Sequence, residues 1–214
     1  MTVLNLSFAA CGFLGIYHLG AVGAFLRHGD KLLGSLRACA GASAGALVAA
    51  VMITAPDKLE HCKEFTYRFA DSVRRQRFGA VTPGYDFMLT LREGIEEILP
   101  SDAHSLATDR LHVSITHSKS GDNRLISRFT SREELIKALL ASSFVPVYAG
   151  IQAVEFRGQT FCFVSIRNGL MEASQTACRS CLWDELSPCP PLLGCRMCVL
   201  STGGALRPNS SWPT

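Results

Sequence analysis

Hydrophobic positions alternate over short stretches of this chain and recur with helical spacing over longer ones. Alternation predicts strands, and a spacing of three to four residues predicts helices. The expected strands are residues 3–8, 36–41, 111–116 and 124–129. The expected helices are residues 13–27, 44–53, 57–76, 85–99 and 132–142. Because strand-like and helix-like segments alternate, the pattern indicates an α/β layered domain.

Several of these elements have recognisable end signals. Pro56 is suited to open the third helix, and Pro146 to follow the end of the last one. Residues 121–123, Gly-Asp-Asn, predict the turn between the last two strands. Ser131 and Glu134 form a predicted capping box, in which the serine accepts the amide of Glu134 and the glutamate reaches back to the amide of Ser131.

The pattern changes near Gln159 and Thr160. Six of the nine cysteines and five of the nine prolines lie after this point, and the apolar periodicity fades. We therefore expect a folded domain over residues 1–159. Residues 160–214 are expected to form a divergent, poorly ordered tail rich in cysteine and proline.

Composition narrows the class of protein and its partners. Hydrophobic residues make up 48% of the chain and charged residues 18%, so a buried core is expected rather than a wholly disordered chain. The net charge is +3 without a long basic run, so no nucleic-acid partner is expected. This charge does not exclude a weakly basic face that contacts anionic lipid. Because residues 1–10 lack the pattern of a secretory signal, the cysteines are expected to be reduced, in a cytoplasmic protein.

One apolar run is nearly long enough to span a membrane. Residues 38–55 carry no charge over eighteen positions, close to the roughly 20 residues that span a bilayer. The run consists largely of alanine and glycine and contains the sequence Gly-Ala-Ser-Ala-Gly at residues 41–45. A buried strand, a sharp turn and a helix are therefore favoured over a membrane span.

The same run carries the main candidate for chemistry. Ser43 lies between Gly41 and Gly45, with Ala42 and Ala44 as its direct neighbours. In a nucleophile elbow, a serine occupies the tight turn from a strand to a helix, small neighbours permit close backbone approach, and the helix N-terminus favours developing negative charge. The competing interpretation is an ordinary glycine-rich turn, but the position between an apolar strand and an apolar helix favours the elbow.

A second glycine element falls at another strand-to-helix junction. Its residues are Cys11, Gly12, Phe13, Leu14 and Gly15. Their backbone amides could form an anion-binding nest that stabilises the oxyanion of an acyl-transfer intermediate. The alternatives are a structural turn or a dinucleotide-binding loop, and the latter is disfavoured because its acidic residue would follow the next strand.

In combination, residues 11–15, 41–45 and the sequence Ala-Ser-Ser-Phe-Val-Pro at residues 141–146 resemble the patatin-like phospholipases, particularly the adiponutrin and adipose triglyceride lipase branch. The resemblance covers residues 3–159. It implies a three-layer α/β/α sandwich and an acyl hydrolase acting on acylglycerols, phospholipids or retinyl esters without a cofactor. It also implies peripheral contact with lipid droplets or membranes.

The resemblance assigns roles to particular residues. Ser43 is implied as the nucleophile, and the amides around Gly12 as the oxyanion hole. The supporting loop and elbow residues are Cys11, Phe13, Gly15, Gly41, Ala44 and Gly45. Ala10 stands where the family's loop has its first glycine, a small change that leaves the turn feasible.

The family's catalytic base has no counterpart here. It is an aspartate in an Asp-Gly-Gly or Asp-Gly-Ala motif, expected shortly after residue 159, yet the sequence contains no Asp-Gly pair. Removing one member of a serine-base unit lowers rates by roughly 10⁴ to 10⁶. The prediction is therefore a sandwich incomplete on its C-terminal side, with weak or no activity. The alternatives are a non-catalytic isoform that binds lipid or a partner, and a chain that does not fold stably.

Other residues could replace the base or bind metal, although each has a simpler explanation. The candidate replacements for the base are His104, His112, His117, Asp122, Asp184 and Glu185. A zinc ribbon would use the spacing of Cys178, Cys181, Cys195 and Cys198. Because the surrounding segment lacks the pattern of a folded unit, no metal is expected.

Two surface features complete the candidates. Arg74, Arg75 and Arg77 precede Phe78 and could contact anionic headgroups, but a solvated helix end is the simpler interpretation. The aromatic residues Phe65, Tyr67 and Phe69 are similarly expected to pack in the core rather than form a lipid groove.

Overall fold

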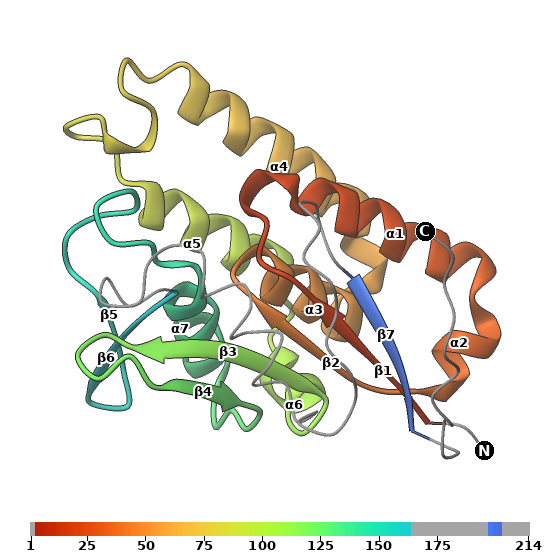
Figure 1. Ribbon diagram of the computed structural model, residues 1–214. Helices are drawn as coiled ribbons and strands as arrows, with labels where there is room; N and C mark the ends of the chain where they lie inside the picture. The colour runs from red at the N-terminus through yellow and green to blue at the C-terminus, as the bar shows by residue number, and fades with distance from the viewer. Residues whose placement is uncertain (1–2, 164–196, 203–214) are drawn as a thin grey trace, which may run out of the picture.

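A single mixed sheet organises the protein. The computed structural model describes residues 3–163 and 197–202, and its strands follow the order β5-β6-β3-β2-β1-β7, with β4 paired to β3 (Figure 1). The strands are β1 Val3–Phe8, β2 Leu36–Ala42, β3 Leu111–His117, β4 Asn123–Ile126, β5 Val154–Phe156, β6 Gln159–Cys162 and β7 Met197–Thr202. The central strands β1, β2 and β3 run parallel, whereas β4, β6 and β7 pair antiparallel with their neighbours.

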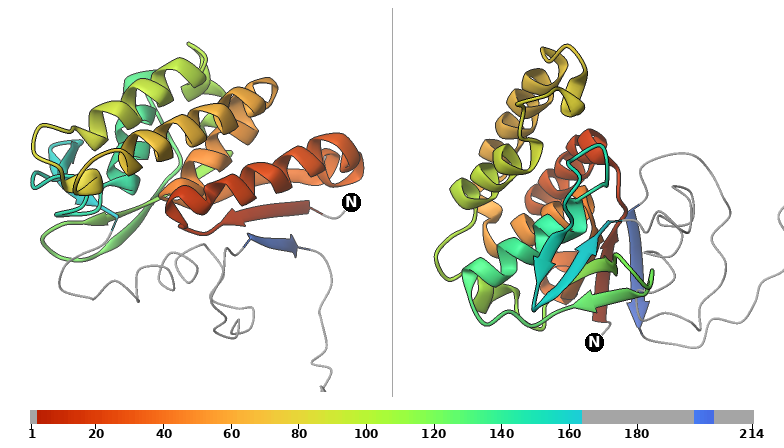
Figure 2. Two further views of the ribbon diagram at one scale, coloured as in Figure 1. Left: turned by 90° about the horizontal axis from the view of Figure 1, so that it is seen from above. Right: turned by 90° about the vertical axis from the view of Figure 1, so that its left-hand side faces the viewer.

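The described helices gather on one face of this sheet (Figure 2). The α-helices are α1 Gly15–His28, α2 Asp30–Ser35, α3 Ala44–Thr54, α4 Leu59–Arg74, α5 Phe87–Ile98, α6 Ala103–Ala107 and α7 Arg132–Ser143. The chain passes from β1 to β2 to β3 in one direction, and right-handed crossovers then place all connecting helices on the same side. The described residues thus supply two of the three layers expected from the resemblance, in a sheet rich in parallel strands.

The predicted α/β class and its main elements are confirmed. Two short helices, α2 and α6, were not expected, because neither is long enough to show an apolar period. The strand predicted over 124–129 ends at Ile126. Phe129 instead turns into the core, and its amide donates to Thr108 Oγ1 at 3.2 Å.

The predicted capping box at the start of α7 is half correct. Ser131 Oγ accepts the amide of Glu134 at 3.2 Å, as expected. Glu134, however, accepts the amide of Thr130 rather than that of Ser131. Arg157 also donates to Glu134 at 2.6 Å, and this bond is the main cause that lowers the pKa of Glu134 to about 2. The carboxylate thereby links α7 to the turn between β5 and β6.

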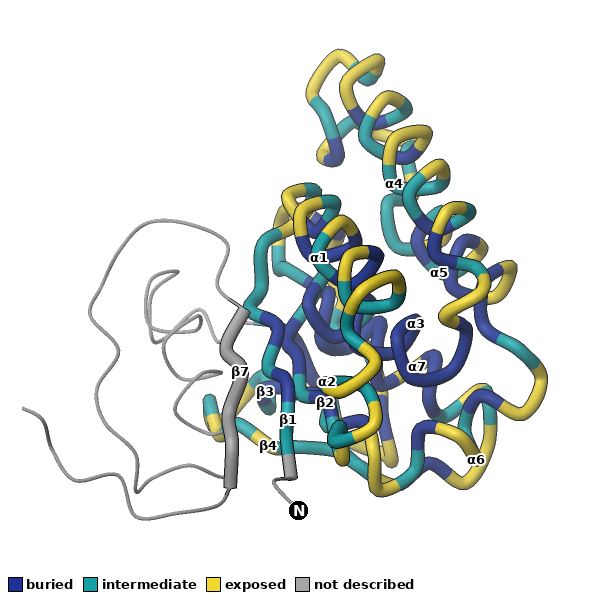
Figure 3. Tube along the Cα trace, turned by 90° about the vertical axis from the view of Figure 1, so that its right-hand side faces the viewer, coloured by how far each residue is buried: buried dark blue, intermediate teal, exposed yellow. Residues whose placement is uncertain are grey.

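Helix α3 lies at the centre of the core (Figure 3). Nine of its eleven residues are buried, and it contacts β1, β2 and β3 together with α1, α4 and α7. Its lack of charge thus reflects burial on all sides, as the sequence interpretation of residues 38–55 predicted. None of the described helices combines the length and apolarity needed to cross a membrane.

The sheet crosses the predicted domain boundary. Strand β6 begins at Gln159 and pairs with β3, while β7 pairs with β1 over six residue positions on the other side. The division into a domain and a tail stays a prediction. The sheet includes two segments beyond the predicted boundary, namely the end of β6 at Cys162 and the whole of β7.

Candidate active site

Ser43 occupies the turn between β2 and α3. It is the N-cap of α3 and has φ 53° and ψ −129°, a region that side-chain-bearing residues rarely adopt. Holding a residue there costs about 1–3 kcal/mol, and such strain concentrates at functional sites. The turn therefore has the sharp geometry that the sequence motif predicted.

Both glycines of the motif are required by close backbone contacts. A Cβ atom on Gly41 would lie 2.5 Å from the Gly45 carbonyl oxygen, and one on Gly45 would lie 2.2 Å from the Phe8 carbonyl oxygen. Neither contact leaves room for a side chain. The two glycines let α3 start directly against β1 and β2, which brings Ser43 to the end of the sheet.

Ser142 holds the turn to the rest of the fold. The backbone N–H of Ser43 donates to Ser142 Oγ at 2.9 Å, and the Ser142 hydroxyl donates to the Ser114 carbonyl at 2.7 Å. Ser142 is fully buried. Through this one side chain, the end of α7 positions the elbow against β3.

Replacing Ser142 with alanine is expected to lower the free energy of unfolding by about 2 kcal/mol, because a partly buried amide and a buried carbonyl lose a hydrogen-bond partner. Urea denaturation measures the change. The matched control is Ser143→Ala, because the neighbouring Ser143 hydroxyl has no hydrogen-bond partner among the described residues. Equal stability of the two variants would contradict the positioning role of Ser142.

The glycine loop lies against the elbow. Gly12–Leu14 forms a 3₁₀ turn, with Gly12 at φ +54°, and a Cβ on Gly15 would lie 3.3 Å from Ala44 Cβ. Within the described residues, this turn uses the amides of Leu14 and Gly15 as donors to Cys11 and Gly12. The amides of Gly12 and Phe13 precede the first helical hydrogen bond, and no acceptor in the described part of the chain takes them.

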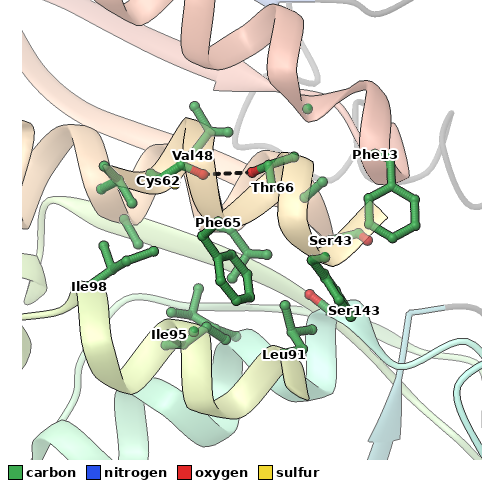
Figure 4. A pocket seen from close by; sticks show the side chains of 18 of the residues that line it. Phe13, Ser43, Val48, Cys62, Phe65, Thr66, Leu91, Ile95, Ile98 and Ser143 are labelled. Carbon is green, nitrogen blue, oxygen red and sulfur yellow. Dashed lines mark hydrogen bonds between the residues drawn. The ribbon is translucent and has the colours of Figure 1, made fainter. Parts of the chain in front are cut away.

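The elbow and the loop open into a cavity of about 260 Å³ between α3, α4 and α5 (Figure 4). Ser43 and Phe13 lie at one end of it, and Ile98 and Cys62 at the other. The lining is almost entirely apolar. Its residues include Leu47, Val48, Val51, Phe65, Phe69, Phe87, Leu91, Ile95, Ile98, Leu99 and Leu139.

The structure brings most of the predicted site residues together. Those that line the cavity are Gly12, Phe13, Gly15, Ser43 and Ala44. The remaining three, Cys11, Gly41 and Gly45, lie outside the lining and shape the backbone. Sequence reasoning missed the roles of the hydroxyl groups of Ser142 and Ser143, although both lie in the motif at residues 141–146.

No base accompanies Ser43 in the described part of the chain, since none of the described cavity-lining residues is Asp, Glu or His. The Cys62 thiol does line the cavity, but burial raises its pKa to about 11, so it stays protonated. Among the described lining residues, the cavity therefore offers the Ser43 hydroxyl without a carboxylate or imidazole that could accept its proton.

The alternative bases lie elsewhere. His104 is in α6, and His112 is half-buried in β3, where burial lowers its pKa. His117 and Asp122 both bond to Ser120 in the turn after β3, at 2.9 and 2.6 Å, so the expected structural role of that turn is observed. Asp184, Glu185 and three of the four zinc-candidate cysteines, Cys178, Cys181 and Cys195, fall outside the described residues.

The aromatic and basic residues of α4 divide between the cavity and the surface. Phe65 and Phe69 line the cavity, whereas Tyr67 is exposed, so only part of the expected core packing is observed. Arg75 pairs with Asp71 at 2.6 Å, and the Arg77 guanidinium lies 5.4 Å from the centre of the Phe78 ring. This end of the helix is exposed to solvent, as predicted.

Comparisons with known proteins assign the part of the chain that contains most of the sheet, the loop and the elbow to one family. Residues 6–164 match the patatin-like phospholipase model. The chain is 62% identical over 170 residues to patatin-like phospholipase domain-containing protein 4 of Homo sapiens, covering 79% of this chain and 67% of the relative. It is 31% identical over 188 residues to 1-acylglycerol-3-phosphate O-acyltransferase Pnpla3 of Mus musculus, covering 87% and 45%. It is 36% identical over 154 residues to omega-hydroxyceramide transacylase of Homo sapiens, covering 72% and 29%.

These relatives are longer than the matched region, and this chain spans less than half of the second and third. Among solved structures, VipD from Legionella pneumophila aligns over 76% of this chain and 45% of that one, at 12% identity and a TM-score of 0.42. The family model covers the residues that form the elbow and the loop, together with most of the strands described above. The chain belongs to the patatin-like phospholipase family.

Proposed function

We propose that this protein is a lipid acyl hydrolase of low activity, in which Ser43 is the nucleophile and the apolar cavity holds the acyl chain. The observation that carries the proposal is a strained serine at the end of a partly open, almost wholly apolar cavity. A long hydrocarbon chain fits this lining, and its ester group would then remain at the Ser43 end, where the described residues combine a hydroxyl with backbone amides.

The proposed reaction is acyl transfer to the serine. Ser43 Oγ attacks the ester carbonyl carbon, and the carbonyl oxygen becomes an oxyanion that accepts the amides of Gly12 and Phe13. The alcohol then leaves with the serine proton, and water hydrolyses the acyl-serine. Because no carboxylate or imidazole among the described cavity-lining residues takes the proton from Ser43, both steps are slow.

The lack of a base among the described lining residues also supports a second function, in which the chain binds lipid without turning it over. An intact apolar cavity retains affinity for acyl chains even when the serine is not activated, since binding depends on buried apolar surface. The two functions differ in one measurable property, which is the formation of a covalent acyl-serine.

Peripheral contact with a droplet or membrane is part of the proposal. Exposed apolar side chains adjoin the cavity-lining residues in sequence, with Leu14 beside Phe13 and Val147 beside Tyr148. Such exposed apolar side chains suit a lipid surface. Arg74 and Arg77 beside Phe78 could add attraction to anionic headgroups.

Fluorophosphonate labelling followed by intact-mass measurement tests the nucleophile. We expect one adduct per chain, located on the peptide that contains Ser43, and turnover of a medium-chain ester at or just above the detection limit. Labelling without turnover would show a reactive Ser43 whose catalysis stops at a later step, whereas no labelling would favour the lipid-binding function. A folded chain that takes up no label would contradict the proposed hydrolase.

A further inference from the structure

Ser143 is a buried hydroxyl that no group in the described part of the chain satisfies. The residue is 8% exposed, it lines the cavity, and its Oγ has no hydrogen-bond partner among the described residues. A buried polar atom without a partner destabilises the folded state. Such a group at the wall of a cavity is understandable when a ligand supplies the missing partner.

Ser143 lacks, within the described residues, the hydrogen bond that a hydroxyl group in a helix usually makes. Serine and threonine in helices commonly donate to the carbonyl four residues earlier. Thr54, Thr66 and Thr108 do so at 2.8, 2.8 and 2.9 Å. Ser143, at the end of α7, does not bond to the carbonyl of Leu139, and its hydroxyl is left for the cavity.

The position of Ser143 restricts what the ligand atom can be. Its neighbour Ser142 bonds to the amide of Ser43, and Figure 4 shows the Ser43 and Ser143 hydroxyls at the same end of the cavity, near Phe13. The other end, around Cys62 and Ile98, carries no comparable unpartnered group in the described lining. A ligand with an apolar chain and one polar end would therefore place that polar end between the two serines.

We propose that Ser143 is a substrate-binding residue whose hydroxyl donates to the carbonyl oxygen of the lipid ester and so sets the carbonyl beside Ser43. This inference rests on the proposed function, because it assumes an acyl chain in the cavity. It adds a side-chain donor from α7 to the backbone amides of the glycine loop. The expected consequence is that the cavity distinguishes carbonyl-bearing chains from plain hydrocarbons.

Competitive binding of 2-octanone and octane to the full chain tests the inference without requiring turnover. Both compounds displace N-phenyl-1-naphthylamine, whose own affinity is titrated directly for each variant. Ser143→Ala is expected to lower the affinity for 2-octanone about threefold to tenfold, since it removes one hydrogen bond. The affinity for octane should stay the same.

Thermal unfolding supplies a second readout that a purely structural serine would not give. Ser143→Ala removes an unsatisfied buried hydroxyl, so the unfolding midpoint without ligand should rise by about 2–4 °C. The matched control is Thr66→Val, which removes another cavity hydroxyl whose bond to the Cys62 carbonyl is already made. This control should leave the preference for the ketone unchanged.

Three results would overturn the role of Ser143. They are equal losses of ketone and octane affinity in Ser143→Ala, a lower unfolding midpoint of that variant, and no dye binding to the unmodified chain. Fluorophosphonate labelling in parallel separates this inference from the proposed function. Labelled Ser43 without a ketone effect rejects only the role of Ser143, whereas a ketone effect without labelling rejects only the hydrolase.

Discussion

Replacing Ser43 with glycine is expected to abolish fluorophosphonate labelling and at the same time to raise the free energy of unfolding by about 1 kcal/mol. The label is lost because the only proposed nucleophile is gone. The stability rises because glycine adopts φ 53° and ψ −129° without the strain of about 1–3 kcal/mol that a side chain carries there. Part of this gain is offset by the greater freedom of glycine in the unfolded chain.

Ser43→Ala is the control for that experiment. It also removes the hydroxyl, but its Cβ keeps the backbone strained, so labelling should vanish without a gain in stability. Intact-mass analysis and urea denaturation measure the two effects on the same samples. Persistent labelling of Ser43→Gly would place the reactive residue elsewhere, and a less stable glycine variant would refute the strain at this turn.

Gly45→Ala is expected to destabilise the fold by at least about 3 kcal/mol. The new Cβ would lie 2.2 Å from the Phe8 carbonyl oxygen and 2.6 Å from that of Ala9. Relief requires moving the end of β1 or the start of α3. Strand β1 is paired on both sides, with β2 and β7, and α3 is buried among its neighbours. Moving either element would therefore break hydrogen bonds or packing contacts and lower the stability of the fold.

Gly20→Ala provides the matched control, because Gly20 lies in α1 and a Cβ there would meet nothing within 4 Å. Its stability should rise by about 0.5–1 kcal/mol, as alanine favours the helix. Denaturation midpoints of the two variants should therefore move in opposite directions. A tolerated Gly45→Ala would show that the elbow and β1 are less closely packed than described.

Much of the fold could be predicted because its central elements are long and strongly patterned. Strands β1, β2 and β3 and helices α4 and α5 follow apolar spacings that tertiary packing reinforces, and α3 is a nearly uninterrupted apolar run that is buried on all sides. Helix α6, with five residues, has too few turns to show a period. Strand β7 pairs with β1 across most of the chain length, and no local pattern encodes so distant a partner.

The candidate site was predictable in its backbone and less so in its side chains. Gly41, Ser43 and Gly45 are close in sequence, so a motif reveals them. Ser142 contacts Ser43 from 99 residues away, and its role follows only from the packing of α7 on β3. The cavity arises where three helices meet, and each contributes residues whose apolar character alone resembles ordinary core.

The pairing of β1 with β7 also constrains the order in which the protein can assemble. Strand β7 follows β1 by roughly 190 residues, which corresponds to about 10–40 seconds of synthesis at ~5–20 residues per second. During that interval the outer edge of β1 presents unpaired backbone groups to other chains. Strand β1 thus depends on a segment that is synthesised much later, and chaperone binding to β1 during translation would protect the elbow that packs directly behind it.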